Sequence, residues 1–307
     1  ANIHGGERES ASSAMSTAWW LALCSGDDYV KGLLDNYIIY VIPVINPDGY
    51  EQSFVINNRP NLRPRDANGD NIPYSDPYTD IDGDGFIATL YRGTADDTPS
   101  RDLPVFGMES PDWDENGILG DDPRTSGIDM NRTFDYQWNR YDIETKDGQQ
   151  VGNVNWTTAG TAPATEPEIK ALQQFLYEHE IDALVSLHTG IQSVLYPWCY
   201  RAYDANNPDD AEIPFMKETA AKMAQVFQDY TGRGFYSMSS NEDYPTAAEL
   251  IDYAYGRYNI HAYTIEVYSP GKSEDGDIST CKWENTMPEA KWVFYSRDEI
   301  RDVLGLD

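Results

Sequence analysis

Hydrophobic residues near the start of the chain follow two different spacings. Over residues 10–25, apolar side chains recur at helical intervals, which predicts an amphipathic helix. Residues 37–45 instead form a continuous run of aromatic and β-branched residues, which predicts a strand buried on both faces of a parallel sheet. The turn-forming residues Asn46-Pro47-Asp48-Gly49 follow, so we expect the chain to turn there.

The pattern becomes irregular in the middle of the chain and regular again towards its end. Residues 60–126 are rich in Asp, Asn, Gly and Pro and show no sustained period, so we expect no regular elements there. Beyond them we expect helices at 166–179, 211–230 and 288–304 and strands at 181–188 and 261–268. This alternation predicts an α/β fold: one domain over residues 1–307, with a mixed, mostly parallel twisted sheet flanked by helices and an insertion at 66–122.

The charge of the chain limits its partners. Asp and Glu number 52 and Lys and Arg number 22, which gives a net charge of −30. Such a charge repels nucleic acids and acidic membranes, and the sequence has no apolar run of about 18 residues. We therefore expect no nucleic-acid partner and no membrane insertion. Secreted proteins, calcium binders and proteins from salty surroundings are typically this acidic, and we expect an extracellular location. The oligomeric state stays open.

Three residues could form a metal site. His4 and Glu7 stand three positions apart in His4-Gly5-Gly6-Glu7, and His188 ends the strand predicted at 181–188. The carboxyl ends of strands are where ligands bind in open α/β sheets. Two histidines and one glutamate form a known catalytic zinc set, which keeps a fourth position open for water. His179 and His261 are expected to be structural.

Several short segments together resemble one enzyme family, the zinc metallocarboxypeptidases of the carboxypeptidase A/B type. They occur in the order that the family has and cover most of the chain outside residues 66–122. The segments are Ile3-His4-Gly5-Gly6-Glu7, Asn46-Pro47-Asp48-Gly49-Tyr50, Gly127-Ile128-Asp129-Met130-Asn131-Arg132, Thr165-Glu166-Pro167-Glu168, Leu187-His188, Leu195-Tyr196-Pro197-Trp198, Tyr244 and Tyr263-Thr264-Ile265-Glu266.

The resemblance implies a function and roles for particular residues. The chain would be a zinc exopeptidase that removes C-terminal residues from peptides or proteins, with one Zn²⁺ held by His4, Glu7 and His188. The further roles are Glu266 as general base, Asn131 and Arg132 as binders of the substrate's terminal carboxylate, Tyr244 as the residue that closes over it, and Arg63 (or else Arg65) as the group that polarises the scissile carbonyl.

The resemblance also implies where specificity lies. Ile251 would stand at the base of the pocket for the C-terminal side chain, and an apolar residue there favours hydrophobic and aromatic termini. Glu249, two residues earlier, either faces water, which we expect, or points inward and pairs with a substrate Lys or Arg. In the family, a helix and strands precede the position of Ala1. We therefore expect the family domain to be N-terminally truncated here and to expose apolar surface.

The acidic insertion contains three patterns with an oxygen ligand at every second position. They are Asp66, Asn68 and Asp70; Asp80, Asp82 and Asp84; and Asp112, Asp114 and Asn116. Such spacing, with glycine at the turn, predicts calcium loops. Because none has the glutamate that completes an EF-hand, carboxylates such as Asp76, Asp121 or Asp122 would complete the shell. The alternative is a solvated acidic loop without a fixed ion.

Two further questions stay open at the level of sequence. We expect Cys199 and Cys281 to form a disulfide, because Cys199 lies near the strand that carries His188 and Cys281 lies in the loop after Glu266, so both should border the same cleft. Cys24 stands at the end of an apolar helix and is expected to be a buried thiol. Two other functions share part of the pattern. One is a zinc amidohydrolase of the same fold, such as an N-acyl amino acid deacylase or a side-chain-trimming peptidase. The other is a binding module without catalysis.

Overall fold

A four-stranded sheet lies at the centre of the described part of the chain. The computed structural model describes residues 1–54, 58–64, 66, 68–81, 87–93, 103–110, 112–117, 119–121, 127–138 and 159–268. The strands are β3 (Ala183–His188), β4 (Ser193–Tyr196), β5 (Tyr236–Ser239) and β6 (His261–Glu266), in the spatial order β3-β6-β4-β5. The pairs β3–β6 and β4–β5 are parallel and β4–β6 is antiparallel. The predicted α/β fold with a mixed, mostly parallel sheet is confirmed.

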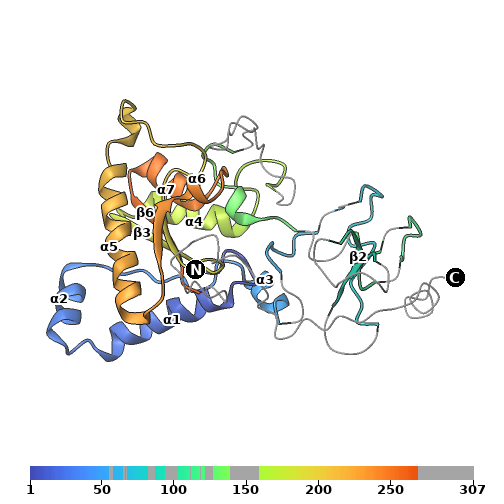
Figure 1. The fold of residues 1–307 in the computed structure, drawn as a ribbon, viewed down its shortest axis with the longest axis horizontal. Coiled ribbons are helices and arrows are strands. Elements are labelled where there is room, and N and C mark those ends of the chain that lie inside the picture. The colour runs from blue at the N-terminus through green and yellow to red at the C-terminus, as the bar shows by residue number, and fades with distance from the viewer. Residues whose placement is uncertain are drawn as a thin grey trace.

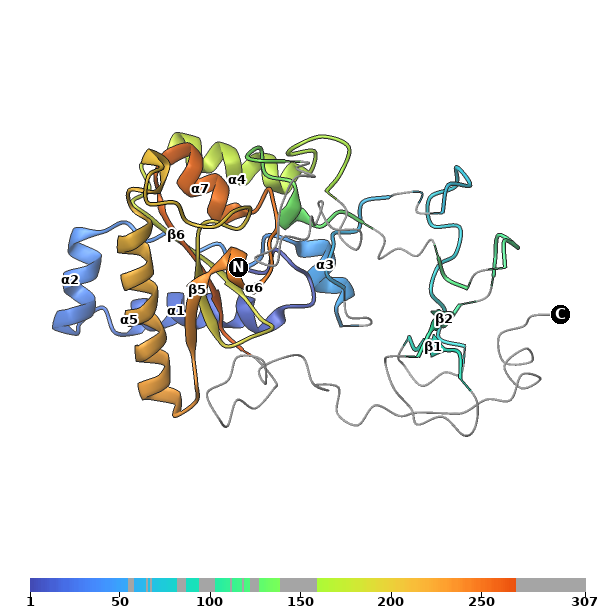
Figure 2. The same cartoon turned by 45° about the horizontal axis from the view of Figure 1, so that its top comes forward.

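Helices cover both faces of this sheet (Figures 1 and 2). The helical elements are α1 (Arg8–Leu23), α2 (Asp28–Asn36), α3 (Pro47–Gln52), η1 (Met130–Arg132), α4 (Pro167–Glu178), η2 (Pro208–Asp210), α5 (Ile213–Thr231), α6 (Ser240–Asp243) and α7 (Leu250–Tyr258). The helices predicted at 10–25, 166–179 and 211–230 and the strands predicted at 181–188 and 261–268 are confirmed within a few residues. The helix predicted at 288–304 lies outside the described residues.

The alternation of side chains along β6 creates two separate cores. Ala262 packs with α4 and α7 on one face, whereas Tyr263 and Ile265 pack with α5 on the other. Ile169 and Leu172 of α4 belong to the first core. Because the sheet is apolar on both faces, polar side chains gather where the strands end.

The strand predicted at 37–45 is wrong. These residues form no strand in the structure, although the backbone N–H groups of Ile45 and Asn46 donate to the carbonyls of Ala1 and Asn2. Ile38 is 80% exposed, although Tyr40 packs against Phe175 and His179 at the end of α4. The turn predicted after it is also different: Asn46 caps α3 by accepting from the N–H of Gly49, and Pro47 begins the helix.

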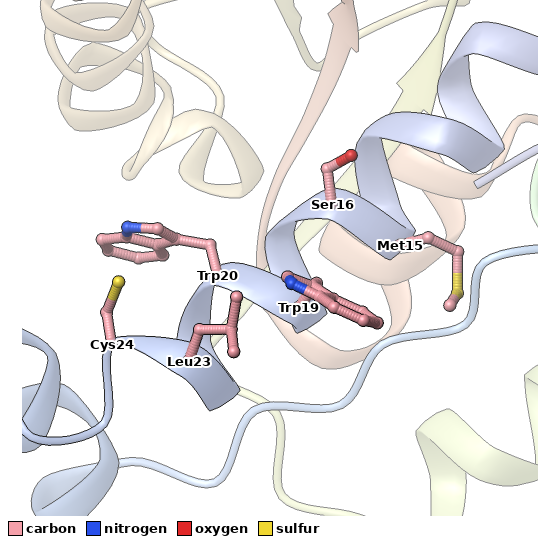
Figure 3. Close-up of a pocket in the computed structure, with 6 residues that line it drawn as sticks. All are labelled: Met15, Ser16, Trp19, Trp20, Leu23 and Cys24. Carbon is pink, nitrogen blue, oxygen red and sulfur yellow. The ribbon is translucent and has the colours of Figure 1, made fainter.

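An apolar surface remains open on α1. Met15, Trp19, Trp20 and Leu23 lie on its outer face and line a shallow hollow with Ser16 and Cys24 (Figure 3). Trp19 is 66% exposed and Leu23 is 70% exposed. Apolar exposure was expected from the resemblance. The described residues show it on this helix and in the run at 37–42, and at single positions elsewhere such as Tyr230. None of the described helices combines the length and apolar character needed to cross a bilayer.

The acidic insertion lies to one side of the α/β body (Figure 1) and carries a small sheet of its own. Strands β1 (Thr89–Tyr91) and β2 (Val105–Met108) pair in antiparallel fashion, with Gly107 bridged to Leu119. The expectation that residues 60–126 form no regular elements is therefore wrong for these two strands. Glu109 reinforces the pair, since its carboxylate accepts from the N–H groups of Ile81 and Ala88.

Candidate functional site

His4, Glu7 and His188 converge at one end of the sheet. Nδ1 of His4 lies 2.7 Å from Oε1 of Glu7, and Nδ1 of His188 lies 3.0 Å from Oε2 of Glu7. One ligand atom of each residue lies within 4.8 Å of those of the other two. Gly5 allows this arrangement, because a Cβ at this position would lie 2.3 Å from the carbonyl carbon of Gly49. The structure thus brings together the three residues that the sequence predicted as metal ligands.

The outer nitrogen of each imidazole lies close to a polar side chain, although for Nε2 of His4 no hydrogen bond forms among the described residues. Nε2 of His4 lies 3.2 Å from Oδ1 of Asp129, and Nε2 of His188 lies 2.9 Å from Oγ of Ser186. Metal-binding histidines are commonly oriented by such groups, and two imidazoles with one carboxylate form a donor set that suits zinc. The residues present therefore fit a zinc ion. The sequence motif Gly127-Ile128-Asp129-Met130-Asn131-Arg132 contained Asp129, but spacing alone did not reveal its contact with His4.

Electrostatics keep Glu7 and His188 in protonation states that can bind a cation. For His4, burial would lower the pKa of the ring, but the carboxylates of Glu7 and Asp129 raise it above its ordinary value. Burial would raise the pKa of the Glu7 carboxyl, but His4 and His188 hold it below its ordinary value. Burial lowers the pKa of His188, which favours the neutral ring. Asp129 is buried as well, yet Arg59 and His4 hold its pKa well below the ordinary range. The centre therefore contains two carboxylates that stay ionised at neutral pH.

Glu266 ends β6 directly beside the metal-ligand strand. The parallel register pairs His188 of β3 with Glu266 of β6. Oε2 of Glu266 is buried and has no hydrogen-bond partner among the described residues. Burial and the nearby Glu7 carboxylate raise the pKa of Glu266 well above its ordinary value. A buried carboxyl group with a raised pKa suits proton transfer near neutral pH.

Arg132 lies in a second polar group near the metal-ligand residues. Its Nη2 lies 3.2 Å from the Tyr244 hydroxyl, and its Nη1 lies 2.9 Å from Oε1 of Glu249 and also donates to the Asn131 carbonyl. The Asn131 side chain donates to Glu249 and accepts from the N–H of Leu250. The structure thus brings Asn131, Arg132 and Tyr244 together.

The expectation that Glu249 faces water is wrong. Glu249 is 7% exposed, and besides Arg132 it accepts from the hydroxyl of Thr246. The physical reason is that α7 begins at Leu250, which places the Glu249 side chain against buried Arg132. Ile251 is 1% exposed and belongs to the core shared with α4.

Two arginines differ in their position relative to the metal-ligand residues. The side chain of Arg63 is half exposed and its Nη1 lies 3.7 Å from Oε1 of Glu166. Arg59, which the sequence did not single out, has its Nε 2.6 Å from Oδ2 of Asp129 and its Nη1 3.9 Å from Oε1 of Glu7. Nη2 of Arg59 is buried without a hydrogen-bond partner among the described residues. In the sequence, the only indication that Arg59 belongs to the site was its position four residues before Arg63. Arg65 lies outside the described residues.

The predicted calcium loops are only partly described. Asp82 and Asp84 lie outside the described residues, as does Asp122. Asp66 and Asp112 turn their carboxylates towards backbone N–H groups of their own loops. Asp70 accepts from the N–H of Ile72. Among the described residues, three carboxylates of the insertion do converge, and they belong to Asp76, Asp114 and Asp121.

The predicted disulfide has one end in the described structure. Cys199 carries a buried free thiol whose Sγ lies 3.5 Å from Oε2 of Glu249, and Cys281 lies outside the described residues. Cys24 is a free thiol that is only partly buried, at the end of α1.

Comparisons with solved structures give the fold. The crystal structure of thrombin activatable fibrinolysis inhibitor matches with a TM-score of 0.54 and 17% identity over 86% of this chain and 52% of that one. The bovine thrombin-activatable fibrinolysis inhibitor in complex with tick carboxypeptidase inhibitor matches with a TM-score of 0.53 and 16% identity, over 91% of this chain and 75% of that one.

Comparisons of sequence give the family. Human mast cell carboxypeptidase A is 26% identical over 55% of this chain and 41% of its own length. Bovine carboxypeptidase B is 27% identical over 55% and 39%. Zinc carboxypeptidase A 1 of Drosophila melanogaster is 25% identical over 78% and 41%, so the chain spans about two-fifths of these relatives. The family model described as "Zinc carboxypeptidase" matches residues 1–286. Together with the two-histidine, one-glutamate centre, this match shows that the chain belongs to the zinc carboxypeptidase family.

Proposed function

We propose that this protein is a zinc-dependent exopeptidase that hydrolyses the C-terminal peptide bond of peptides or proteins. The observation that carries the proposal is the parallel register of His188 and Glu266. In this register a candidate base lies beside a candidate metal ligand at the carboxyl ends of β3 and β6. The buried Arg132 supplies a carboxylate-binding group in the same region.

The residues divide the chemistry between them. Zinc held by His4, Glu7 and His188 would lower the pKa of water and polarise the scissile carbonyl. Glu266 takes a proton from the attacking water and passes it to the leaving amine. A cationic side chain stabilises the charge that develops on the carbonyl oxygen. Arg63 was expected in this role. Arg59 contacts Asp129, and its buried Nη2 has no hydrogen-bond partner among the described residues, so we favour Arg59 for this role.

The terminal carboxylate of the substrate is bound by Arg132 with Asn131 and Tyr244. An arginine can hold a carboxylate by parallel hydrogen bonds. Nη1 of Arg132 is already engaged by Glu249, and Nη2 lies beside the Tyr244 hydroxyl. We propose that the substrate carboxylate is bound on the Nη2 side, where Tyr244 shares it. A clamp of this kind restricts cleavage to the last residue of a chain.

We propose that the enzyme prefers hydrophobic or aromatic C-terminal residues. Ile251 offers no charge to a basic side chain, and the carboxylate of Glu249 is already paired with Arg132. Burying a phenyl or aliphatic side chain contributes about 1.5–3 kcal/mol, whereas burying an unpaired cation is unfavourable.

We also propose an extracellular location, which the acidic composition supports. Detection of the protein in the medium of expressing cells tests this proposal.

Three substrates separate this function from its alternatives. N-blocked Gly-Phe should release Phe, and N-blocked Gly-Phe amide should not, because the amide lacks the carboxylate that Arg132 binds. An N-acyl amino acid serves as the third substrate. Faster cleavage of the acyl amino acid than of the dipeptide would indicate a deacylase. Full zinc occupancy without cleavage of any substrate would indicate a binding module.

A further inference from the structure

Three carboxylates from separate parts of the acidic insertion meet at one point. Asp76, Asp114 and Asp121 each place one oxygen within 4.8 Å of those of the other two. Asp114 belongs to the pattern Asp112-x-Asp114-x-Asn116, whereas Asp76 follows the pattern that begins at Asp66. The group is therefore assembled by tertiary structure and is not a single linear loop.

Asp76 has an oxygen that lacks a partner in the interior of this group. Its side chain is fully buried. Oδ1 accepts from the backbone N–H groups of Trp113 and Asp114, at 2.8 and 3.3 Å. Oδ2 is buried and has no hydrogen-bond partner among the described residues. A buried carboxylate oxygen without a donor is costly, so Oδ2 requires a cation or a proton.

The described side chains around this group do not balance its charge. Two amide groups donate to the carboxylates: Nδ2 of Asn68 lies 2.7 Å from Asp114 and 3.3 Å from Asp121, and Nδ2 of Asn116 lies 2.9 and 3.0 Å from them. Amides carry no net charge. No Lys or Arg within the described ranges forms an ion pair with Asp76, Asp114 or Asp121. Three negative charges therefore remain close together.

We propose that Asp76, Asp114 and Asp121 bind one divalent cation, and that this cation is calcium. The ligands are oxygens only, which a hard cation requires. Calcium accepts irregular arrangements of carboxylates, whereas magnesium demands near-octahedral geometry. Burial and the neighbouring carboxylates Asp114 and Asp121 also raise the pKa of Asp76, as expected for an acid that lacks its counter-ion.

This composite site differs from the linear loops that the sequence predicted. In the structure both oxygens of Asp112 accept from backbone N–H groups of its own loop, those of Asn116 and Gly117. Asp112 thus shapes the loop that presents Asp114, without belonging to the three-carboxylate group. The site also lies close in sequence to Tyr74, whose hydroxyl donates to the carbonyl of Leu62.

Calcium titration of the zinc-loaded protein tests the proposal. Calcium is removed by dialysing the protein against buffer that has been passed over a chelating resin. Calcium binding is then followed by calorimetry and by the melting temperature. Magnesium at the same concentrations controls for general screening of the acidic surface. Because ligand binding stabilises by mass action, the melting temperature should rise with calcium up to about millimolar concentrations and much less with magnesium.

Matched variants identify the ligands. Asp76→Asn keeps an acceptor for the N–H groups of Trp113 and Asp114 but removes the charge of the carboxylate. Asp121→Asn also removes one carboxylate charge from the group, at a less buried position. Glu115→Gln removes the same charge from an exposed side chain of the same loop, outside the group. We expect the first two variants to weaken calcium binding about tenfold or more, and Glu115→Gln to weaken it less than about threefold.

Each outcome decides the proposal. Absence of calcium binding by the wild-type protein would overturn it, and so would wild-type affinity in a folded Asp121→Asn variant. Equal losses in Glu115→Gln and Asp121→Asn would show that calcium responds only to the general charge of the loop, and would also overturn the proposal. Should Asp76→Asn fail to fold, Asp121→Asn alone decides, with zinc content as the check that the α/β body is intact.

Discussion

Nη1 of Arg132 lies 2.9 Å from Oε1 of Glu249, and both side chains are buried. Arg132 ends η1 and Glu249 immediately precedes α7, so the ion pair joins two segments that are far apart in the sequence. A buried guanidinium without a carboxylate partner would be strongly unfavourable. The pair thus keeps Arg132 in the interior and holds Nη2 next to Tyr244.

Replacing Glu249 tests the structural side of this pair. Glu249→Gln keeps a hydrogen-bond acceptor but leaves Arg132 without a countercharge, and we expect it to lower the free energy of unfolding by about 3 kcal/mol. Denaturant unfolding followed by fluorescence measures the change. Glu178→Gln removes an exposed carboxylate and should change stability by less than about 0.5 kcal/mol. Equal stability of the two variants would contradict a structural role for the pair.

Loss of the candidate base should separate metal binding from catalysis. Glu266→Gln removes the proton acceptor and retains the three metal ligands, so we expect full zinc content and a fall in kcat of about 10²-fold or more. His188→Ala should lose zinc as well. Metal analysis and hydrolysis of a blocked dipeptide are the two measurements. A Gln variant that keeps about a tenth or more of the wild-type activity would exclude Glu266 as the base, because a general base contributes about 10²-fold or more to the rate.

The two candidate arginines can be compared directly. Arg59→Lys moves the charge away from the site near Glu7 and Asp129, and we expect kcat to fall about 10²- to 10³-fold. Arg63→Lys should cost less than about threefold, since Arg63 is half exposed beside Glu166. Zinc content must be measured for both, because Arg59 also contacts the carboxylate that lies beside His4. A larger loss of kcat in Arg63→Lys would restore the sequence-based assignment.

The substrate preference follows from Ile251 and the paired state of Glu249. We expect otherwise identical peptides to lose a C-terminal Phe or Leu faster than Arg, with Arg measurable as the second choice. The ratio of kcat/KM values is the measurement. A preference for Arg or Lys of about tenfold would mean that Glu249 leaves Arg132 to bind the substrate, and Glu249→Gln would then abolish that preference.

Asp252 should make stability depend on pH. Burial, with the nearby Glu249 carboxylate, raises the pKa of Asp252 to about 7 from an ordinary value of 3.8. The folded state therefore binds this proton more tightly than the unfolded state, and its contribution to stability is lost as the pH rises from about 4 to about 7. Asp252→Asn keeps an acceptor for the N–H of Cys199 and should flatten this part of the pH–stability curve. An identical slope in wild type and variant would refute the assignment.

Local patterns in the sequence were sufficient for much of the fold and for the metal-ligand residues. Helical spacing at 166–179 and 211–230 and the β-branched run at 261–268 each correspond to a regular element, because each segment has an apolar face that one period can bury. The segment at 37–45 has an equally strong strand pattern. It forms no strand because a ladder needs a neighbour, and no described strand pairs with it.

The sequence by itself determined which chemical groups the chain has: the motif His4-Gly5-Gly6-Glu7, a histidine and a glutamate that each end a buried strand, and many carboxylates in one insertion. Tertiary structure decided which of these groups meet. It placed Asp129 behind His4, paired Glu249 with Arg132, and brought Asp76 to Asp114 and Asp121. These contacts join residues tens of positions apart, and their strength depends on burial and on distances of a few ångströms. Neither quantity is encoded in local spacing, so only the folded chain could reveal them.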